Sequence, residues 1–266
     1  MAALHNSFKA ALRGDPVPRI GLFMGLCDPG VAELLGDTGL DWLLIDGEHG
    51  PNDLRTVLAQ LRALEACRAD VLVRIVDHDP ALIKQMLDIG VQSLLVPMVE
   101  SAEQARALVR ATRYPPAGIR GVGSALARAA RWNGVPDYLK RADDEICLIV
   151  QAESRASLDA LDDILTVEGV DAVFIGPSDL AASMGHLGQP EHPEVRAAVL
   201  GALEKVVRSG KAAGVFATRL DTARLYCQAG ARFVALGTDT LLLRQSAAGL
   251  VQAFHAGAAQ AAGAGY

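Results

Sequence analysis

The chain has 266 residues, of which 51% are hydrophobic and 21% charged. It can therefore bury a substantial core, and we expect one domain spanning residues 1–266. The net charge of -6 and the lack of a Lys/Arg cluster argue against a nucleic-acid partner. No apolar run reaches membrane-spanning length and no signal peptide is recognisable, so we expect a cytoplasmic protein without a membrane partner. The four cysteines lie far apart in the sequence, which favours reduced thiols.

Eight short apolar runs have the length of buried strands, and segments with helical spacing separate them. This strand and helix alternation, with strands apolar on both faces, predicts a parallel sheet closed into an α/β (β/α)8 TIM barrel. Glycines follow three of the helical segments, as at helix ends. The predicted strands are 20–24, 42–46, 71–74, 93–97, 146–151, 172–175, 212–216 and 233–236, and the helical segments include 53–66, 80–89, 102–112, 154–165, 194–209 and 220–229.

Two further segments stand out from this alternation. The connection from residue 113 to 144 is longer than the others, which is typical of a functional or interface segment. The tail over residues 256–266 is rich in Ala and Gly, so we expect it to fray. In a β/α barrel the loops after the strands build the active site, so chemistry is expected directly after each strand.

The second predicted strand ends in a dense polar cluster, Asp46-Gly47-Glu48-His49. A histidine here can transfer protons near neutral pH, and a nearby aspartate such as Asp46 can orient its ring. The alternative is that both carboxylates only cap the next helix while His49 is solvated. The residues alone leave both interpretations open.

The third predicted strand ends in Arg74, within an otherwise apolar segment. A guanidinium in this position needs an anionic partner. It can pair with a structural carboxylate, or it can bind substrate oxygens and stabilise a developing enolate charge.

The fifth and sixth predicted strands end in further polar residues. Gln151 and Glu153 alternate onto one face, and Gly176 precedes Ser178 and Asp179 at the start of a helix. Glycine allows close backbone approach, and the following amides can hold a carboxylate. Two carboxylates without a Cys or His triad suit Mg²⁺ or a similar ion. The structural alternative makes Asp179 a helix cap and Glu153 an ion-pair partner.

Taken together, these motifs resemble the HpcH/HpaI class II pyruvate aldolase family over nearly the whole chain. The family implies a reversible cleavage of 4-hydroxy-2-oxo acids, such as 4-hydroxy-2-oxoheptane-1,7-dioate, to pyruvate and an aldehyde such as succinic semialdehyde, in aromatic catabolism. The resemblance rests on the segments 6–10, 41–49, 94–98, 113–132 with Arg120-Gly121-Val122-Gly123-Ser124, and 174–180.

The resemblance also implies roles for the polar residues. A divalent ion, Mg²⁺, Mn²⁺ or Co²⁺, is held by Glu153 and Asp179. Pyruvate contacts Gln151 and the amides of Ser178 and Asp179. Arg74 stabilises the enolate and His49 is the catalytic base.

In this family an aspartate corresponding to Asp88 raises the basicity of the catalytic histidine. Asp88 ends a predicted helix before the fourth strand, at the opposite barrel face from His49, so it would more readily reach a neighbouring subunit's site. The family is typically hexameric, as a trimer of dimers, with exchanged terminal helices. We therefore expect a homohexamer that exchanges its C-terminal helix.

Several alternatives accompany this interpretation. Phe23, Ser178 and Phe216 depart from the family pattern, and the two phenylalanines bear on the aldehyde pocket. Related sugar-acid aldolases for 2-keto-3-deoxy-L-rhamnonate or 5-keto-4-deoxy-glucarate would use the same metal site. A non-catalytic barrel that binds keto acids is the alternative from another class, which His49 and Arg74 argue against. A Schiff-base mechanism is disfavoured because all five lysines lie in helical or linking segments.

Overall fold

The structure is a computed structural model that describes residues 4–263. Its centre is a closed barrel of eight parallel strands in sequence order, which confirms the predicted (β/α)8 barrel. Neighbouring strands are parallel, with one register shift where β1 pairs with β8, between Gly21 and Phe23. Asp46 and Arg74 are register partners at the ends of β2 and β3. The strands are β1 Arg19–Met24, β2 Trp42–Asp46, β3 Asp70–Arg74, β4 Ser93–Val96, β5 Cys147–Ala152, β6 Ala172–Ile175, β7 Ala212–Phe216 and β8 Phe233–Thr238.

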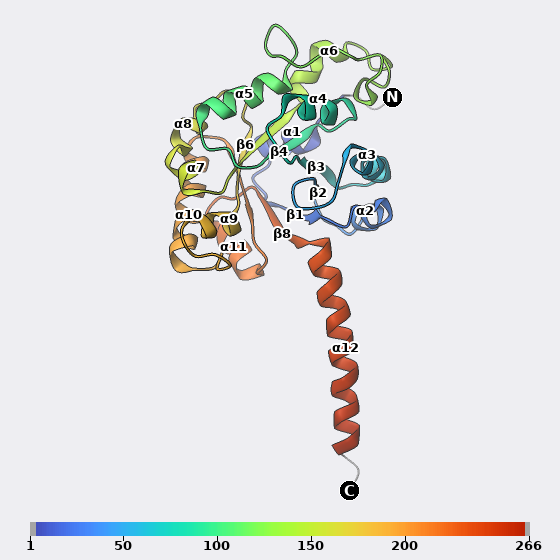
Figure 1. The fold of residues 1–266 in the computed structure, drawn as a ribbon, viewed down its shortest axis with the longest axis vertical. Helices are drawn as coiled ribbons and strands as arrows, with labels where there is room; N and C mark the ends of the chain where they lie inside the picture. Colours follow the sequence, from blue (N-terminus) through green and yellow to red (C-terminus); the bar gives the residue numbers. More distant parts are fainter. Residues whose placement is uncertain (1–3, 264–266) are drawn as a thin grey trace.

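Helices surround the barrel, and the predicted helical segments are confirmed within a few residues at their ends (Figure 1). The predicted helix 154–165 is divided into two short helices at Ala160. The helices are α1 Ser7–Gly14, α2 Pro29–Gly36, α3 Leu54–Ala63, α4 Pro80–Asp88, α5 Ala102–Thr112, α6 Tyr138–Arg141, α7 Arg155–Asp159, α8 Leu161–Leu165, α9 Pro177–Ser183, α10 Pro193–Arg208, α11 Leu220–Gln228 and α12 Asp239–Gly263, with 3-10 turns at Leu64–Ala66, Arg128–Ala130 and Ala142–Glu145.

The barrel interior is filled by aromatic and aliphatic side chains. Phe8 and Leu12 of α1 join this inner cluster with Trp42, Phe174 and Phe233. Small residues make room for the rings: a Cβ at Gly21 would overlap Trp42, and one at Gly214 would overlap Phe233. The interior is therefore a packed core, and any ligand site must lie at a barrel end.

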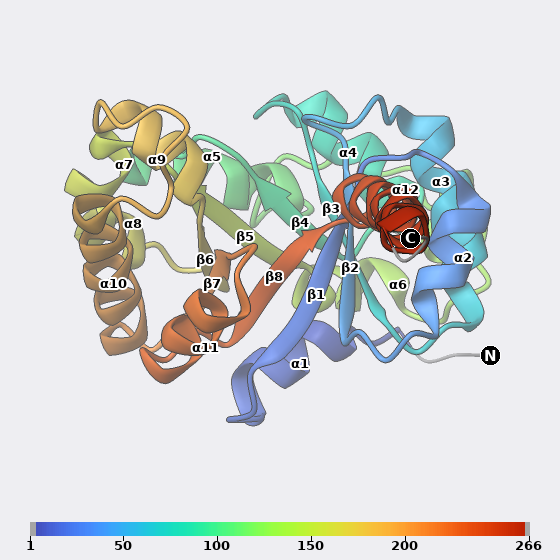
Figure 2. The ribbon, with the colours of Figure 1, turned by 90° about the horizontal axis from the view of Figure 1, so that it is seen from below.

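The helix α12 leaves the barrel after β8 and projects away from it (Figure 1). Viewed along α12, the helices α2 and α3 lie on one side of the strands and α8 and α10 on the other (Figure 2). The helix includes residues 256–263 of the tail predicted to fray, and residues 264–266 lie outside the described part. Among the described residues, none of the helices is both long and apolar enough to span a bilayer.

The long connection between β4 and β5 contains α5, two 3-10 turns and α6, and packs as a small cluster of its own. Tyr114 and Tyr138 are buried there with small alanines. Arg120 is 1% exposed and stacks over the Tyr114 ring, with 4.5 Å from its guanidinium carbon to the ring centroid. This connection is thus an ordered part of the barrel's outer layer.

Candidate active site

The polar residues predicted to form a site lie at the carboxyl ends of neighbouring strands. Asp46 ends β2 and Arg74 ends β3. Gln151 lies in β5, and Glu153 is the first residue after that strand. Asp179 lies in the first turn of α9. This is the barrel end that carries the active site in enzymes of this fold.

Arg74 and Asp46 form a buried, bidentate ion pair. Arg74 Nε and Nη2 donate to the two carboxylate oxygens of Asp46 at 2.9 and 2.6 Å. Glu48 Oε2 lies 2.8 Å from Arg74 Nη1, although the geometry is not that of a hydrogen bond. The structural carboxylate considered for Arg74 is therefore Asp46. The pair holds the guanidinium in a fixed orientation at the barrel end.

Glu153 is almost fully buried, at 2% exposed, and its carboxylate is positioned by two donors. The Met98 backbone N–H donates to Oε1 at 2.9 Å, and Gln151 Nε2 contacts Oε2. A Cβ at Gly176 would lie 2.6 Å from Glu153 Oε2 and 3.0 Å from Gln151 Nε2. Only glycine leaves the space that the Glu153 carboxylate occupies.

Electrostatics at this end are dominated by negative charge. Burial raises the pKa of Glu153 to about 7, and Glu48 and Asp179 contribute in the same direction while the Met98 N–H opposes it. Burial also raises the pKa of Glu48, against the influence of Arg74. Burial opposes the charge of Arg74, but Asp46 and Glu48 outweigh it and raise its pKa. Four carboxylates thus influence one another around a single guanidinium.

This donor set fits a divalent cation. Carboxylate oxygens are preferred ligands of Mg²⁺ and similar ions, and such an ion would neutralise the excess negative charge of Glu48, Glu153 and Asp179. Gln151 Oε1 is buried and has no hydrogen-bond partner among the described residues, so it can accept a bond from a ligand or water. Among residues 4–263, Glu153 forms no ion pair within 4.0 Å, and its contacts are the Met98 N–H and Gln151 Nε2.

A second set of metal-ligating side chains occurs elsewhere in the described chain. Ligand atoms of His186, His192 and Glu194 lie within 4.8 Å of one another. The two imidazole rings are stacked, with centroids 3.7 Å apart and planes inclined by 17°. Nearly parallel rings cannot direct their in-plane nitrogen lone pairs at one ion, so this arrangement lacks the geometry of a metal site.

The start of α9 gives two more predicted residues their positions. Gly176 is the N-cap, no side chain caps the helix, and Pro177 occupies the first turn. Ser178 and Asp179 are both exposed. The helix-cap alternative for Asp179 is therefore not realised, since it lies inside the helix. Its carboxylate is accessible on the same barrel end as Glu153.

His49 and Asp88 lie apart from the buried carboxylate cluster. The His49 side chain is 68% exposed, with Nε2 3.9 Å from Glu48 Oε2. Asp46 accepts from the His49 backbone N–H at 3.4 Å and has its oxygens on Arg74. Asp88 ends α4 and pairs with Arg120 at 2.9 Å, at the amino end of β4. Within this chain, the structure brings neither aspartate against the His49 ring.

Three residues that support this end were not identified from the sequence in these roles. The Phe23 ring underlies Arg74, 5.0 Å from its guanidinium carbon. Met98 supplies the N–H that positions Glu153. Asp239, at the start of α12, accepts from the Gly25 and Leu26 N–H groups at 2.8 and 3.1 Å and fixes the loop after β1. Of these three residues, only Asp239 had a sequence signal for a role at the site, because it is a carboxylate directly after the last strand.

The fold and the acidic cluster define a β/α-barrel protein with a polar site at the carboxyl ends of its strands. The chain belongs to the HpcH/HpaI aldolase/citrate lyase family, whose model matches residues 19–246.

Relatives with assigned names cover most of the chain. It is 60% identical over 251 residues to a hydroxypyruvate/pyruvate aldolase of Deinococcus radiodurans, covering 94% of this chain and 90% of that protein. It is 54% identical over 253 residues to a 4-hydroxy-2-oxo-heptane-1,7-dioate aldolase of Escherichia coli, covering 95% and 96%. A crystal structure of a family member from Burkholderia cenocepacia has a TM-score of 0.90 at 39% identity, covering 94% of this chain and 99% of that one.

Proposed function

We propose that this protein is a divalent-metal-dependent class II aldolase that reversibly cleaves a 4-hydroxy-2-oxo acid to pyruvate and an aldehyde. The observation that carries the proposal is a fixed, buried guanidinium, Arg74, beside a carboxylate set that suits a divalent ion. Glu153 and Asp179 are the proposed metal ligands, and the ion would supply charge stabilisation to the keto-acid oxygens. The family membership and the names of the relatives support the aldolase assignment.

The chain's own residues have distinct proposed roles in the cleavage direction. His49, directly or through a water molecule, accepts the proton of the C4 hydroxyl as the bond between C3 and C4 breaks and the aldehyde departs. Arg74 faces the charge that then develops on the C2 oxygen. Losing a preorganised donor of this kind costs about 100-fold or more in rate. Protonation at C3 completes pyruvate.

Substrate orientation is proposed to depend on β5 and α9. Gln151 Oε1 and Nε2 lie beside Glu153, and the N–H groups of Ser178 and Asp179 follow Gly176 at the start of α9. The Nε2 amide group of Gln151 and these backbone N–H groups can donate to the carboxylate and the keto oxygen of pyruvate. They act by positioning the substrate, since a near-attack geometry lowers the entropic part of the barrier.

Two donor substrates are supported by the relatives. The relatives named 4-hydroxy-2-oxo-heptane-1,7-dioate aldolase support the proposal that this chain forms pyruvate and succinic semialdehyde from that substrate. The relative at 60% identity, named for hydroxypyruvate and pyruvate, favours hydroxypyruvate as a second donor. Assays of both donors against a panel of aldehydes, with products identified by mass spectrometry, distinguish these two and the sugar-acid alternative.

The decisive test of the reaction class uses metal removal and one variant. Chelator-treated protein should lose aldolase activity and recover it with Mg²⁺, Mn²⁺ or Co²⁺, and comparing the recovered rates identifies the preferred ion. Arg74→Ala should be nearly inactive. Full activity after chelation, or a wild-type rate for Arg74→Ala, would overturn the proposal.

Assembly is the second part of the proposal. In a homohexamer that exchanges α12, partner subunits would cover this helix, which projects from the barrel (Figure 1). A cytoplasmic location is also part of the proposal. Asp88 would then act on the His49 of a neighbouring subunit. Mixing and reassembling inactive His49→Ala and Asp88→Asn proteins should restore part of the activity, because some sites then contain both intact residues. No recovery from the reassembled mixture would contradict action across the interface.

A further inference from the structure

A hollow of about 720 Å³ lies at the amino ends of the strands, opposite the candidate active site. Its walls come from α1, from the segments that precede β6 and β8, and from the connection between α10 and β7. We call this hollow the basal pocket. Its size falls within the range of about 300 to 1,000 Å³ that is usual for small-molecule sites.

The basal pocket is lined by four cationic side chains from three segments of the chain. Lys9 and Arg13 come from α1, Lys211 precedes β7 and Arg232 precedes β8, while Asp171 is the one acidic residue of the lining. The chain as a whole carries a net charge of -6. A local excess of positive charge on an acidic protein marks a place where an anion is attracted.

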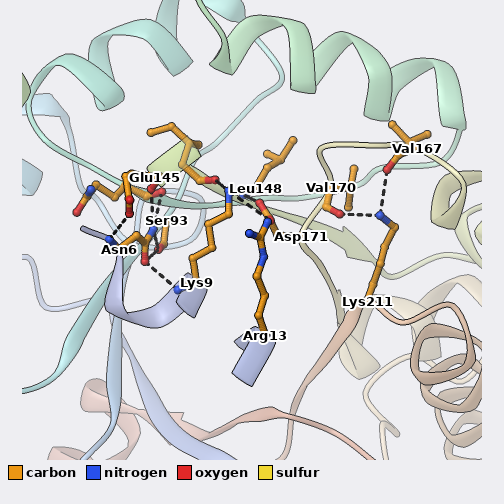
Figure 3. Close-up of polar contacts among 12 residues, drawn as sticks. Asn6, Lys9, Arg13, Ser93, Glu145, Leu148, Val167, Val170, Asp171 and Lys211 are labelled. Carbon is orange, nitrogen blue, oxygen red and sulfur yellow. Dashed lines mark hydrogen bonds and ion pairs between the residues drawn. The ribbon is translucent and has the colours of Figure 1, made fainter. Parts of the chain in front are cut away.

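Asp171 is already neutralised by its neighbours (Figure 3). Its Oδ1 lies 3.4 Å from Lys9 Nζ and 3.0 Å from Arg13 Nη2, and its Oδ2 accepts from the Leu148 N–H at 3.0 Å. Lys9 also donates to the Ile146 carbonyl at 2.6 Å. Lys9 therefore has a structural role at the base of the barrel, and Asp171 has little capacity left for the other two cations.

Arg232 lacks such a role. Its Nε is buried without a hydrogen-bond partner, and no carboxylate lies within 4.0 Å of its guanidinium among residues 4–263. A buried guanidinium N–H left without an acceptor is unfavourable, and native structures seldom retain one without a ligand, water or ion. The planar fork of Arg232 suits the oxygens of a carboxylate or phosphoryl group.

Lys211 supplies a second donor directed by the fold. Its ammonium group donates to the carbonyls of Val167 and Val170 at 3.0 and 2.7 Å (Figure 3). An ammonium group has three N–H donors, so one remains after these bonds. Burial lowers the pKa of Lys211, while Asp171 and Glu168 oppose that shift. A bound anion would favour its charged form.

We propose that the basal pocket is a second, non-catalytic site that binds a small multivalent oxyanion, a metabolite carrying phosphoryl or several carboxylate groups. Arg232 and Lys211 are its main donors, and Arg13, whose side chain is 69% exposed, contributes at its rim. The volume exceeds what one bare ion fills, so the hollow has room for a ligand with a carbon skeleton between its charged groups.

The test is calorimetric titration of inorganic phosphate and of citrate into the full chain at low ionic strength. The proposal expects binding that weakens at least 10-fold in Arg232→Gln. The matched control, Arg106→Gln, removes the same charge from an exposed arginine of α5 and should bind like wild type. Comparing phosphate with citrate shows whether phosphoryl or carboxylate groups are preferred.

A third variant, Arg74→Ala, distinguishes anion binding in the basal pocket from anion binding at the catalytic end. An anion held by Arg74 would be lost in Arg74→Ala and kept in Arg232→Gln, whereas the basal pocket predicts the reverse. If Arg232→Gln does not fold, Arg13→Gln should still weaken binding several-fold without disturbing the core. Failure of both anions to bind wild type, or equal binding by wild type and all basal-pocket variants, would overturn the proposal.

Discussion

Asp46 of β2 and Arg74 of β3 are register partners and bind each other through two parallel hydrogen bonds of 2.9 and 2.6 Å. Both side chains are less than a tenth exposed. The pair therefore points the guanidinium toward the carboxylate cluster, and Asp46 acts as a positioning residue for Arg74. Its oxygens are engaged there and are not available to orient the His49 ring in this arrangement.

Asp46→Asn should lower the cleavage rate on the order of 10- to 100-fold, because Arg74 loses a charged, bidentate acceptor. The main effect is expected in kcat, since Arg74 is proposed to act on charge that develops during the reaction. Steady-state kinetics on the pyruvate-forming reaction measures both constants.

The matched control for this variant is Asp221→Asn. Arg219 binds Asp221 through the same two atoms, Nε and Nη2, at 3.1 and 2.6 Å, but both side chains are exposed. Breaking that surface pair should leave kcat and KM unchanged. An unchanged kcat for Asp46→Asn would show that Arg74 needs no such support.

Glu153→Gln should stabilise the metal-free protein at alkaline pH while abolishing activity. The pKa of Glu153 is about 7 in the folded chain, against its usual 4.5. The folded state then holds a proton that the unfolded state releases, so stability falls as pH rises from about 4.5 through about 7. The neutral amide removes this loss, roughly 1 to 3 kcal/mol at pH 8.

Urea unfolding at pH 5 and pH 8 checks the sign of this effect. The gain from Glu153→Gln should be largest at pH 8 and small at pH 5. Glu33→Gln, an exposed change of the same type in α2, should show no such pH dependence. A variant less stable than wild type at pH 8 would mean that the buried carboxylate is already compensated without metal.

The same pKa predicts how metal binding depends on pH. A proton on Glu153 competes with the ion, so the apparent affinity for Mn²⁺ should rise about tenfold per pH unit below pH 7 and level off above it. Calorimetric titration between pH 5.5 and 8.5 should also detect the released proton through its dependence on buffer ionisation. A flat profile over this interval would rule out Glu153 as a ligand that titrates near pH 7.

Gly176→Ala should reduce metal binding and activity by at least 10-fold, because its Cβ would lie 2.6 Å from Glu153 Oε2 and force the carboxylate to move. Gly201→Ala is the control, since nothing lies within 4 Å of its Cβ in α10. That change should leave activity intact and stabilise the helix by about 0.5 to 1 kcal/mol. Normal Mn²⁺ binding by Gly176→Ala would show that the segment between β6 and α9 can shift to accommodate the Cβ without displacing Glu153.

Much of this site follows from sequence because a β/α barrel brings strand ends together. Once eight strands are counted, Asp46, Arg74 and Glu153 must lie at one end, and the structure confirms this. The partner of each group does not follow, because it depends on strand register and side-chain direction. The sequence therefore left Arg74 with either a structural or a catalytic anion, and register placed Asp46 opposite it.

Contacts between segments that are distant in the sequence also could not be predicted from the sequence pattern. Asp239 holds the loop after β1, more than 200 residues earlier, and the Met98 N–H reaches Glu153 from the end of β4. Backbone donors carry no residue-type signal. The Ala-rich composition that predicted a fraying tail is equally compatible with a helix, because alanine has the highest helix propensity.

The projecting helix α12 supports a last prediction, about assembly. Leu243, Leu250 and Phe254 are 62%, 74% and 76% exposed, and their spacing of seven and four residues places them on one helical face. A single chain leaves this apolar face in water, which a partner subunit would cover. Leu250→Glu with Phe254→Glu should therefore dissociate the proposed hexamer into smaller species in light scattering. The activity proposed to depend on Asp88 of a neighbour should be lost with it. Gln252→Glu adds a charge at an exposed position of the same helix and should leave the hexamer intact. A hexamer that survives the double substitution would mean that α12 is not the element that joins subunits.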